Sequence, residues 1–320
     1  MLRPLKRVLA KDTRAGIALA ARHAGFARVR RLEDGIVSVT ARVLDSSAND
    51  ESWADDAASE AAEMGLGRAP ASAVLSADAY QLQLVELPNV PAEELGSAVR
   101  WRIKDLIDYP LEEAVVEVFE MPPHSNAAST RTGYAVVSRD EDVLKQIDLV
   151  KQADLRMDVI DIPELCIRNI AVRLPQDQDG IAFMHLVEDC GFLTVTRRGV
   201  LYLIRRIDTG NRLLAEAAGD EFLLQERIAG IALEVQRSLD YYESHYDCRP
   251  ITELVLGPGA AVDTLSAALA EQLGLTVSPF RLDDLFRMEN DLSTDEQGSC
   301  LLAVGAALRS DSASQKAAQR

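Results

Sequence analysis

The chain has 320 residues, of which 48% are hydrophobic and 27% are Asp, Glu, Lys or Arg, proportions typical of a globular protein. Ordinary domains have roughly 100–200 residues, so this length predicts two lobes and excludes a miniprotein that depends on disulfides or metals for stability. The formal net charge of -17 disfavours nucleic acid and anionic membrane surfaces as partners.

Two features that the sequence lacks narrow the class further. No segment has the roughly 18–20 uninterrupted apolar residues that would span a bilayer, which argues against a multi-span membrane protein. The four cysteines form no CxxC pair, and the four histidines have no zinc-binding spacing. We therefore expect reduced thiols, a cytoplasmic location and no metal site.

The two ends of the chain differ from the rest in composition. Residues 1–13 are basic, with apolar residues at roughly helical spacing and Asp12 as the single acidic side chain. Such a segment can touch an anionic membrane, although a frayed terminus is the commoner outcome for so short a helix. Residues 310–320 are polar and predict a disordered tail.

The most informative feature is an internal repeat. GIALAARHAGFARVRR begins at Gly16, and GIAFMHLVEDCGFLTVTRR begins at Gly180. Each copy starts with Gly-Ile-Ala, continues to a Gly-Phe pair and ends in two arginines, and the second copy is two residues longer before that pair. Each continues into a further strand, over 37–43 and 199–207. The repeat predicts two lobes that begin with the same three-stranded β-meander.

Helices are expected after both meanders. Residues 49–64 are rich in Ala, Glu and Asp and form the first helix, which ends at Gly65-Leu66-Gly67. In the second lobe, apolar residues recur at helical spacing and predict a long amphipathic helix ending near Tyr246. They are Leu224, Ile228, Ile231, Val235, Leu239 and Tyr242. A strand over 253–256, a Gly257-Pro258-Gly259-Ala260 turn, a helix over 263–273 and a strand over 275–277 then indicate an α/β lobe.

Residues 91–158 do not repeat and predict an inserted α-β-β-α subdomain. A helix over 93–107 is followed by strands over 115–119 and 134–137 and a helix over 140–153. The apolar face of its first helix consists of Leu95, Val99, Ile103 and Leu106. The predicted organisation is a basic segment (1–13), a first lobe (14–90 and 159–176), the inserted subdomain (91–158), a second lobe (177–309) and a polar tail (310–320).

Three segments carry a resemblance to a known family: SAVRWRIKDLIDYPLEEAVVEVFE, YAVVSRDEDVLKQIDLVKQADLRMDVIDIPELC and ALEVQRSLDYYESHY. They resemble the PilM group of actin-like proteins of type IV pilus assembly, especially its members in mannose-sensitive haemagglutinin (MSHA) pilus systems. The resemblance covers about residues 14–309. It implies an α/β, actin-like (ASKHA) two-lobe fold with an inserted subdomain of the FtsA/PilM type.

The resemblance also implies a function. Proteins of this group are cytoplasmic, peripheral to the inner membrane, and hold the cytoplasmic N-terminal peptide of a PilN-like bitopic membrane protein. The same role is expected here, with membrane contact mainly through that partner. Self-association is left open.

In the actin-like fold, ATP and magnesium usually lie between the lobes and meet an Asp-Ile-Gly-Ser type of hairpin in each. The matching stretches here are Ala18-Leu19-Ala20-Ala21 and His185-Leu186-Val187-Glu188, the second placed one residue out of the register set by the Gly-Phe pairs. Neither stretch contains the Asp that organises magnesium. We therefore expect a degenerate cleft with no catalytic residue, metal or cofactor, and keep ATP/Mg binding as the alternative.

The adenosine side of the cleft has kept more of the family pattern. Gly257, Gly259 and Ala260 are candidate nucleotide contacts, because they match a Gly-Gly-Gly-Ala-like turn, but Pro258 removes one backbone N–H. Two glycines before a helix are also common in an ordinary tight turn.

Trp101 lies opposite the apolar face of the 93–107 helix, among polar residues. It either anchors a partner peptide or packs under the neighbouring lobe. The resemblance places the peptide groove between the first lobe and the inserted subdomain. Trp101, Tyr109, Pro110 and Leu111 are therefore the predicted partner-binding residues.

Three functional hypotheses follow. The leading one is a non-catalytic pilus-assembly scaffold, and the alternative is an ATP-binding actin-like switch or ATPase of the same machinery. A sugar or acetate kinase on the same fold is disfavoured because neither hairpin supplies an Asp.

Overall fold

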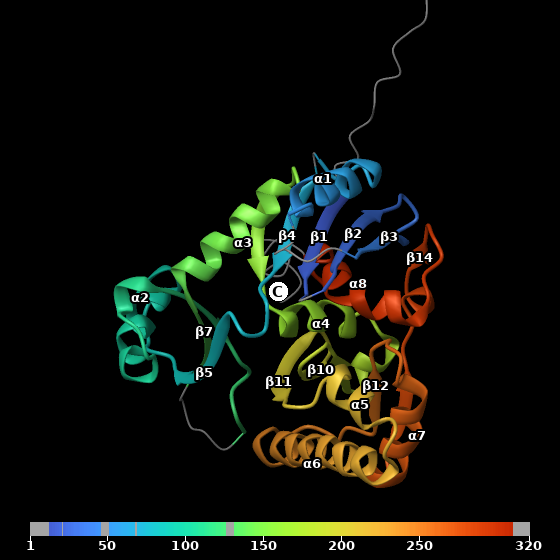
Figure 1. Ribbon diagram of the computed structural model, residues 1–320. Helices are drawn as coiled ribbons and strands as arrows, with labels where there is room; N and C mark the ends of the chain where they lie inside the picture. Colours follow the sequence, from blue (N-terminus) through green and yellow to red (C-terminus); the bar gives the residue numbers. More distant parts are fainter. Residues whose placement is uncertain (1–12, 21, 46–50, 68, 126–130, 310–320) are drawn as a thin grey trace, which may run out of the picture.

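The computed structural model describes residues 13–20, 22–45, 51–67, 69–125 and 131–309. Apart from Thr13, the predicted basic segment and the polar tail lie outside this part of the chain. The described residues form three β-sheets with helices packed on them, arranged as two lobes and an insert at one side (Figure 1).

The first lobe is built on a six-stranded sheet. In spatial order its strands are β14 (Arg287–Met288), β3 (Val37–Leu44), β2 (Ala24–Arg31), β1 (Thr13–Leu19), β4 (Pro70–Val74) and β8 (Arg156–Asp161). Strands β1 to β3 form the predicted antiparallel meander, and β4 and β8 continue the sheet in parallel. Its helices are α1 (Trp53–Glu63), α3 (Asp140–Gln152), α4 (Pro163–Ala171) and α8 (Thr294–Ala307).

Side chains on the two faces of this sheet pack in two separate hydrophobic cores. Ala15 and Ile17 of β1 pack in one core with α1 and α3, whereas Ala18 belongs to the other core with α4 and α8. Successive side chains of a strand point to opposite faces, so a central strand covered on both sides is apolar throughout. This explains why β1 reads as a continuous apolar run.

The second lobe repeats the plan with a five-stranded sheet. In spatial order its strands are β11 (Val200–Ile207), β10 (Gly191–Arg197), β9 (Ile181–Leu186), β12 (Glu253–Leu256) and β13 (Thr276–Pro279). Its helices are α5 (Asn211–Ala217), α6 (Glu221–His245) and α7 (Val262–Leu273). The predicted meander, the long amphipathic helix and the β-turn-α-β order after it are all confirmed.

The insert, residues 80–139, has a three-stranded sheet in the order β5 (Tyr80–Glu86), β7 (Thr132–Arg139), β6 (Ala114–Glu120). It also contains α2 (Ala92–Arg102) and the 3₁₀ helices η1 (Lys104–Leu106) and η2 (Leu111–Glu113). Strand β5 precedes the predicted boundary at residue 91, while α3, predicted to belong to the inserted subdomain, contributes Leu149 and Val150 to a first-lobe core. The predicted helix over 93–107 ends early, and Leu106 is 50% exposed instead of buried.

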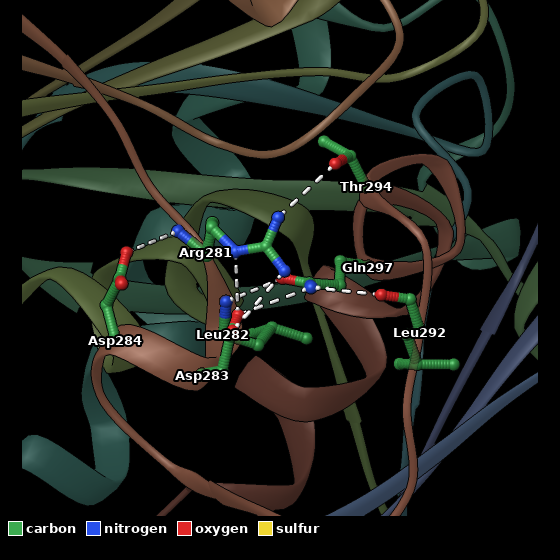
Figure 2. Close-up of polar contacts among 7 residues, drawn as sticks. All are labelled: Arg281, Leu282, Asp283, Asp284, Leu292, Thr294 and Gln297. Carbon is green, nitrogen blue, oxygen red and sulfur yellow. Dashed lines mark hydrogen bonds and ion pairs between the residues drawn. The ribbon is translucent and has the colours of Figure 1, made fainter.

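The end of the chain returns to the first lobe. Strand β14 pairs in parallel with β3, and α8 packs on β1 and β2, so the span 177–309 predicted as the second lobe includes elements of the first. Between β13 and α8 the chain contains η4 (Leu282–Asp284). The amide of buried Gln297 holds this crossover in place, because it accepts from the Leu282 N–H at 2.8 Å and donates to Asp283 Oδ1 and the Leu292 carbonyl (Figure 2).

Candidate functional site

A cavity of about 760 Å³ lies between the two lobes. Its walls are formed by the turns of the β1–β2 and β9–β10 hairpins, the segment after β4, parts of α3 and α8, and the turn after β12. This is the cleft that the sequence predicts as the nucleotide position.

The two hairpins align residue for residue. The matched pairs are Ala18 with Gly25 and Leu19 with Ala24 in the first, and His185 with Phe192 and Leu186 with Gly191 in the second. Because both turns are therefore of equal length, Ala18 and His185 occupy equivalent positions, as the resemblance predicts. In this alignment Gly25 corresponds to Phe192, so the two Gly-Phe pairs are displaced from each other by one residue.

His185 fills the hairpin position at which the resemblance leads us to expect an Asp. Its side chain is 2% exposed, and burial lowers its pKa to about 4, so the ring is neutral at pH 7. Its Nδ1 has no hydrogen-bond partner within the described residues. A neutral imidazole and the methyl group of Ala18 cannot supply the negative charge that organises a magnesium ion and its waters.

The turn after β12 presents its two glycines differently. A Cβ on Gly257 would lie 2.6 Å from His185 Nδ1, whereas a Cβ on Gly259 would meet nothing closer than Asn211 Oδ1 at 4.0 Å. Pro258, Gly259 and Ala260 line the cleft, and Gly257 does not. The structure thus brings two of the three predicted contacts, Gly259 and Ala260, to the cavity, while Gly257 serves as packing space for the histidine ring.

The charged lining of the cleft is mainly acidic. The carboxylates are Asp78, Asp142, Glu188, Asp189 and Asp295, and the Lys and Arg residues are Arg22, Lys145 and Arg206. Glu188 and Asp189 lie in the turn of the second hairpin, where Arg22 approaches Glu188 at 3.6 Å and Arg212 binds Asp189 at 2.6 Å. With five carboxylates against three Lys and Arg residues, the charged lining disfavours the binding of a polyphosphate. The described residues contain no group of three His, Cys, Asp or Glu that could hold a metal.

One contact joins the insert to the first lobe, and another joins the two lobes beside the cleft. The hydroxyl of Tyr80 donates to Glu164 Oε2 at 2.6 Å, and burial raises the pKa of this carboxyl to about 7. Arg206 of the second lobe donates to the Ala77 carbonyl at 2.6 Å. Neither Glu164 nor Arg206 was singled out from the sequence. A single Glu within an apolar helix and one Arg of a pair carry no pattern that marks them.

The predicted partner-binding residues divide into exposed and buried ones. Trp101 is 73% exposed, so it does not pack under a neighbouring lobe. Pro110 is exposed, and the half-buried ring of Tyr109 carries the Arg139 guanidinium 4.1 Å from its centroid. Leu111 is 8% exposed and belongs to the core of the insert. Its prediction as a partner contact is therefore corrected: η2 turns this side chain inward, where it packs with α2.

No helix among the described residues is both long enough and apolar enough to cross a bilayer.

Comparisons with known proteins establish the fold. No protein-family model matches the sequence, and no curated protein matches it. Among solved structures, a chain of a PilM-PilN type IV pilus biogenesis complex matches with a TM-score of 0.73 and 18% identity, over 92% of this chain and 97% of that one. The chain has the actin-like fold. Its two meander-based lobes and this match agree with the resemblance seen in the sequence.

Two further structures match more distantly. A Bacteroides thetaiotaomicron protein described as having an actin-like ATPase fold and unknown function has a TM-score of 0.49 and 12% identity, over 92% of this chain and 96% of the other. The ethanolamine utilization protein EutJ from Carboxydothermus hydrogenoformans has a TM-score of 0.49 and 11% identity, over 92% and 89%.

Proposed function

We propose that the chain is a non-catalytic scaffold of an MSHA-type pilus assembly platform, corresponding to MshI, that binds the cytoplasmic N-terminal peptide of a PilN-like inner-membrane protein. The observation that carries this proposal is the agreement in fold, over nearly the whole chain, with a chain of a PilM-PilN complex. In this role the protein is cytoplasmic and reaches the inner membrane through its partner.

The cleft supports the non-catalytic part of the proposal. Phosphoryl transfer in this fold needs magnesium held against the phosphates and a group that orients the nucleophile. Ala18 and His185 supply neither, and Glu188 and Asp189 place negative charge beside the expected phosphate path. The chain therefore keeps the two-lobed framework and has lost the groups that the reaction needs.

The surface of the insert supports the partner-binding part. Trp101 is an exposed aromatic at the C-terminal end of α2, and the Tyr109-Pro110 segment follows it closely in the chain. A Trp on a polar face can bury a large apolar area against a peptide at little cost in conformational entropy. The cation–π contact with Arg139 holds the Tyr109 ring in place for such a contact.

We expect Trp101→Ala to weaken binding of the partner peptide by at least about 30-fold, since truncation of a hot-spot aromatic costs about 2 kcal/mol or more. Tyr109→Ala should weaken it as well. The measurement is calorimetric titration of each variant with the cytoplasmic N-terminal peptide of the PilN-like protein.

Phe222→Ala is the matched control, because Phe222 is an aromatic side chain that is 80% exposed but lies on α6, away from the insert. It should bind the peptide like the wild type. If Trp101→Ala and Tyr109→Ala are folded and also bind with wild-type affinity, the peptide site is not on this part of the insert.

The alternative, an ATP-dependent switch, is favoured by one observation: a 760 Å³ cavity remains between the lobes, with Gly259 and Ala260 on its wall. A ligand that binds the native state raises the melting temperature according to the ratio of its concentration to its Kd. We expect millimolar Mg-ATP to leave the melting temperature unchanged within the error of the measurement. A reproducible increase of several degrees, or magnesium-dependent ATP hydrolysis, would favour the switch over the scaffold.

A further inference from the structure

A second cavity, of about 250 Å³, lies between the insert and the second lobe, apart from both the cleft and Trp101. Strands β5 and β7 and the segment after β6 form one wall, and β11 and the end of α6 form the other. Sites for cofactors and drug-sized ligands usually have about 300–1,000 Å³. A smaller cavity open to the surface is better suited to one or two side chains of a bound peptide.

The cavity runs along the free edge of a strand. Four consecutive residues of β11, from Tyr202 to Arg205, border it, although successive side chains of a strand point to opposite faces. Strand β11 pairs with β10 on one side, and within the described residues its other edge makes no backbone hydrogen bond. Strand β5 of the insert, which supplies Leu84 to the cavity, is also the edge of its sheet. Unpaired strand edges are templates for an added extended chain.

The residues that line this cavity are rich in tyrosine and differ in charge from the rest of this acidic protein. It includes the aromatic rings of Tyr134, Tyr202, Tyr241 and Tyr246. In a chain with a net charge of -17, none of the described residues that line the cavity is Asp or Glu, whereas Arg205 is among them. Arg205 is exposed, and no ion pair or hydrogen bond of its guanidinium is found among the described residues. The cavity therefore offers apolar surface beside an uncompensated positive charge.

Hydrogen bonds beside the cavity join its two walls. The backbone N–H of Ser125, in the insert, donates to the His245 carbonyl at the end of α6 at 2.9 Å, and the Asp247 N–H donates to the Ser125 hydroxyl. The ring of His124 packs against that of His245 with centroids 5.0 Å apart. The two walls are thus held at a fixed spacing, so a ligand that enters does not have to bring them together.

We propose that this cavity is a second docking site, which takes an extended acidic peptide of a protein partner. The peptide adds to the free edge of β11, places an apolar side chain among the tyrosines and against Leu84, and pairs a carboxylate with Arg205. The partial exposure of Leu84, 52%, fits this role, because an isolated apolar side chain beside an open strand edge gains from being covered. This site is independent of the surface around Trp101.

The test uses three capped hexapeptides of alternating Thr and Leu that carry Asp, Asn or Lys at one central position, titrated against the full chain by fluorescence polarisation. The Asp peptide should bind at least about tenfold more tightly than the Asn peptide, and the Lys peptide least, since charge-assisted pairs contribute more than neutral hydrogen bonds. Arg205→Gln should remove the preference for Asp. The matched control is Arg156→Gln, which removes an exposed Arg on β8 and should leave the preference intact.

A fourth peptide, the Asp peptide with alternate backbone nitrogens methylated, tests the strand pairing. It should lose most of its affinity, because methylation removes the N–H groups that a strand edge needs. Equal binding of the Asp and Asn peptides, unchanged binding by Arg205→Gln, or undiminished binding of the methylated peptide would each overturn the proposal. Loss of binding by Trp101→Ala would also overturn it, because the site would then be the surface of the insert.

Discussion

Replacement of Gly16 by alanine is expected to destabilise the native state by about 3 kcal/mol or more. A Cβ at this position of β1 would overlap the carbonyl oxygen of Ala303 and come within 2.8 Å of its carbon and 3.0 Å of the Ala307 nitrogen. All three are backbone atoms of α8, which is buried against β1 and β2, so no side chain can move aside. Overpacking a rigid core costs typically about 1–3 kcal/mol and sometimes more. Equilibrium unfolding in urea measures the loss.

Gly230→Ala is the control for this prediction. Nothing lies within 4 Å of a Cβ at Gly230, on the exposed face of α6. Alanine there should stabilise the helix by up to about 1 kcal/mol, since glycine is unfavourable within helices. If Gly16→Ala unfolds at the wild-type urea concentration, then α8 does not approach β1 as closely as described.

The same glycine shows where the sequence repeat misleads. Because Ala18 is equivalent to His185 in the two hairpins, Gly16 is equivalent to Phe183, and the second Gly-Ile-Ala starts three residues too early to match the first. Gly16 makes room for α8, whereas Gly180 has a φ of +99° in a turn before β9. The duplication of the meander was predicted correctly, but the Gly-Ile-Ala and Gly-Phe residues that identified it do not occupy equivalent positions in the two hairpins.

Elements with a local signal were predicted well. The spacing of apolar residues in α6 depends only on the period of a helix, and the glycine at position 274 marks the end of α7 through its φ of +64°. Pairings between distant segments leave no such signal. Nothing in 80–86 indicates that β5 joins the sheet of the insert, and nothing in 287–288 indicates that the chain returns to the first lobe.

The candidate sites show the same limit. The lack of an Asp in either hairpin stretch could be read from residue types alone. The place of Trp101 opposite the apolar face of α2 left two outcomes open, a peptide anchor or a side chain packed under the neighbouring lobe, and its 73% exposure excludes the second. The inward turn of Leu111 could not be predicted, because it depends on a 3₁₀ helix that begins after Pro110. The cavity beside β11 was also missed, since its walls come from five elements of the chain that meet only in the fold.

Gly257→Ala is expected to destabilise the protein by about 1–3 kcal/mol, the usual cost of overpacking. The new Cβ would lie 2.6 Å from His185 Nδ1 and 3.1 Å from the Cβ of His185, so the ring, which is 2% exposed, would have to shift out of its packed position. In a His185→Ala background the space is vacant, so the same substitution should cost less than about 1 kcal/mol. Gly259→Ala is the control and should be nearly neutral. Urea unfolding of the four proteins of the cycle and of the control gives these differences.

This cycle decides what the glycine of the turn is for. If the cost of Gly257→Ala falls when His185 is removed, the glycine is needed to make room for the histidine ring and not for contact with a nucleotide. Equal costs in both backgrounds would contradict this. The turn would then need its glycine for reasons unrelated to His185, and a nucleotide bound against Gly257, Gly259 and Ala260 would become the better explanation of the cleft.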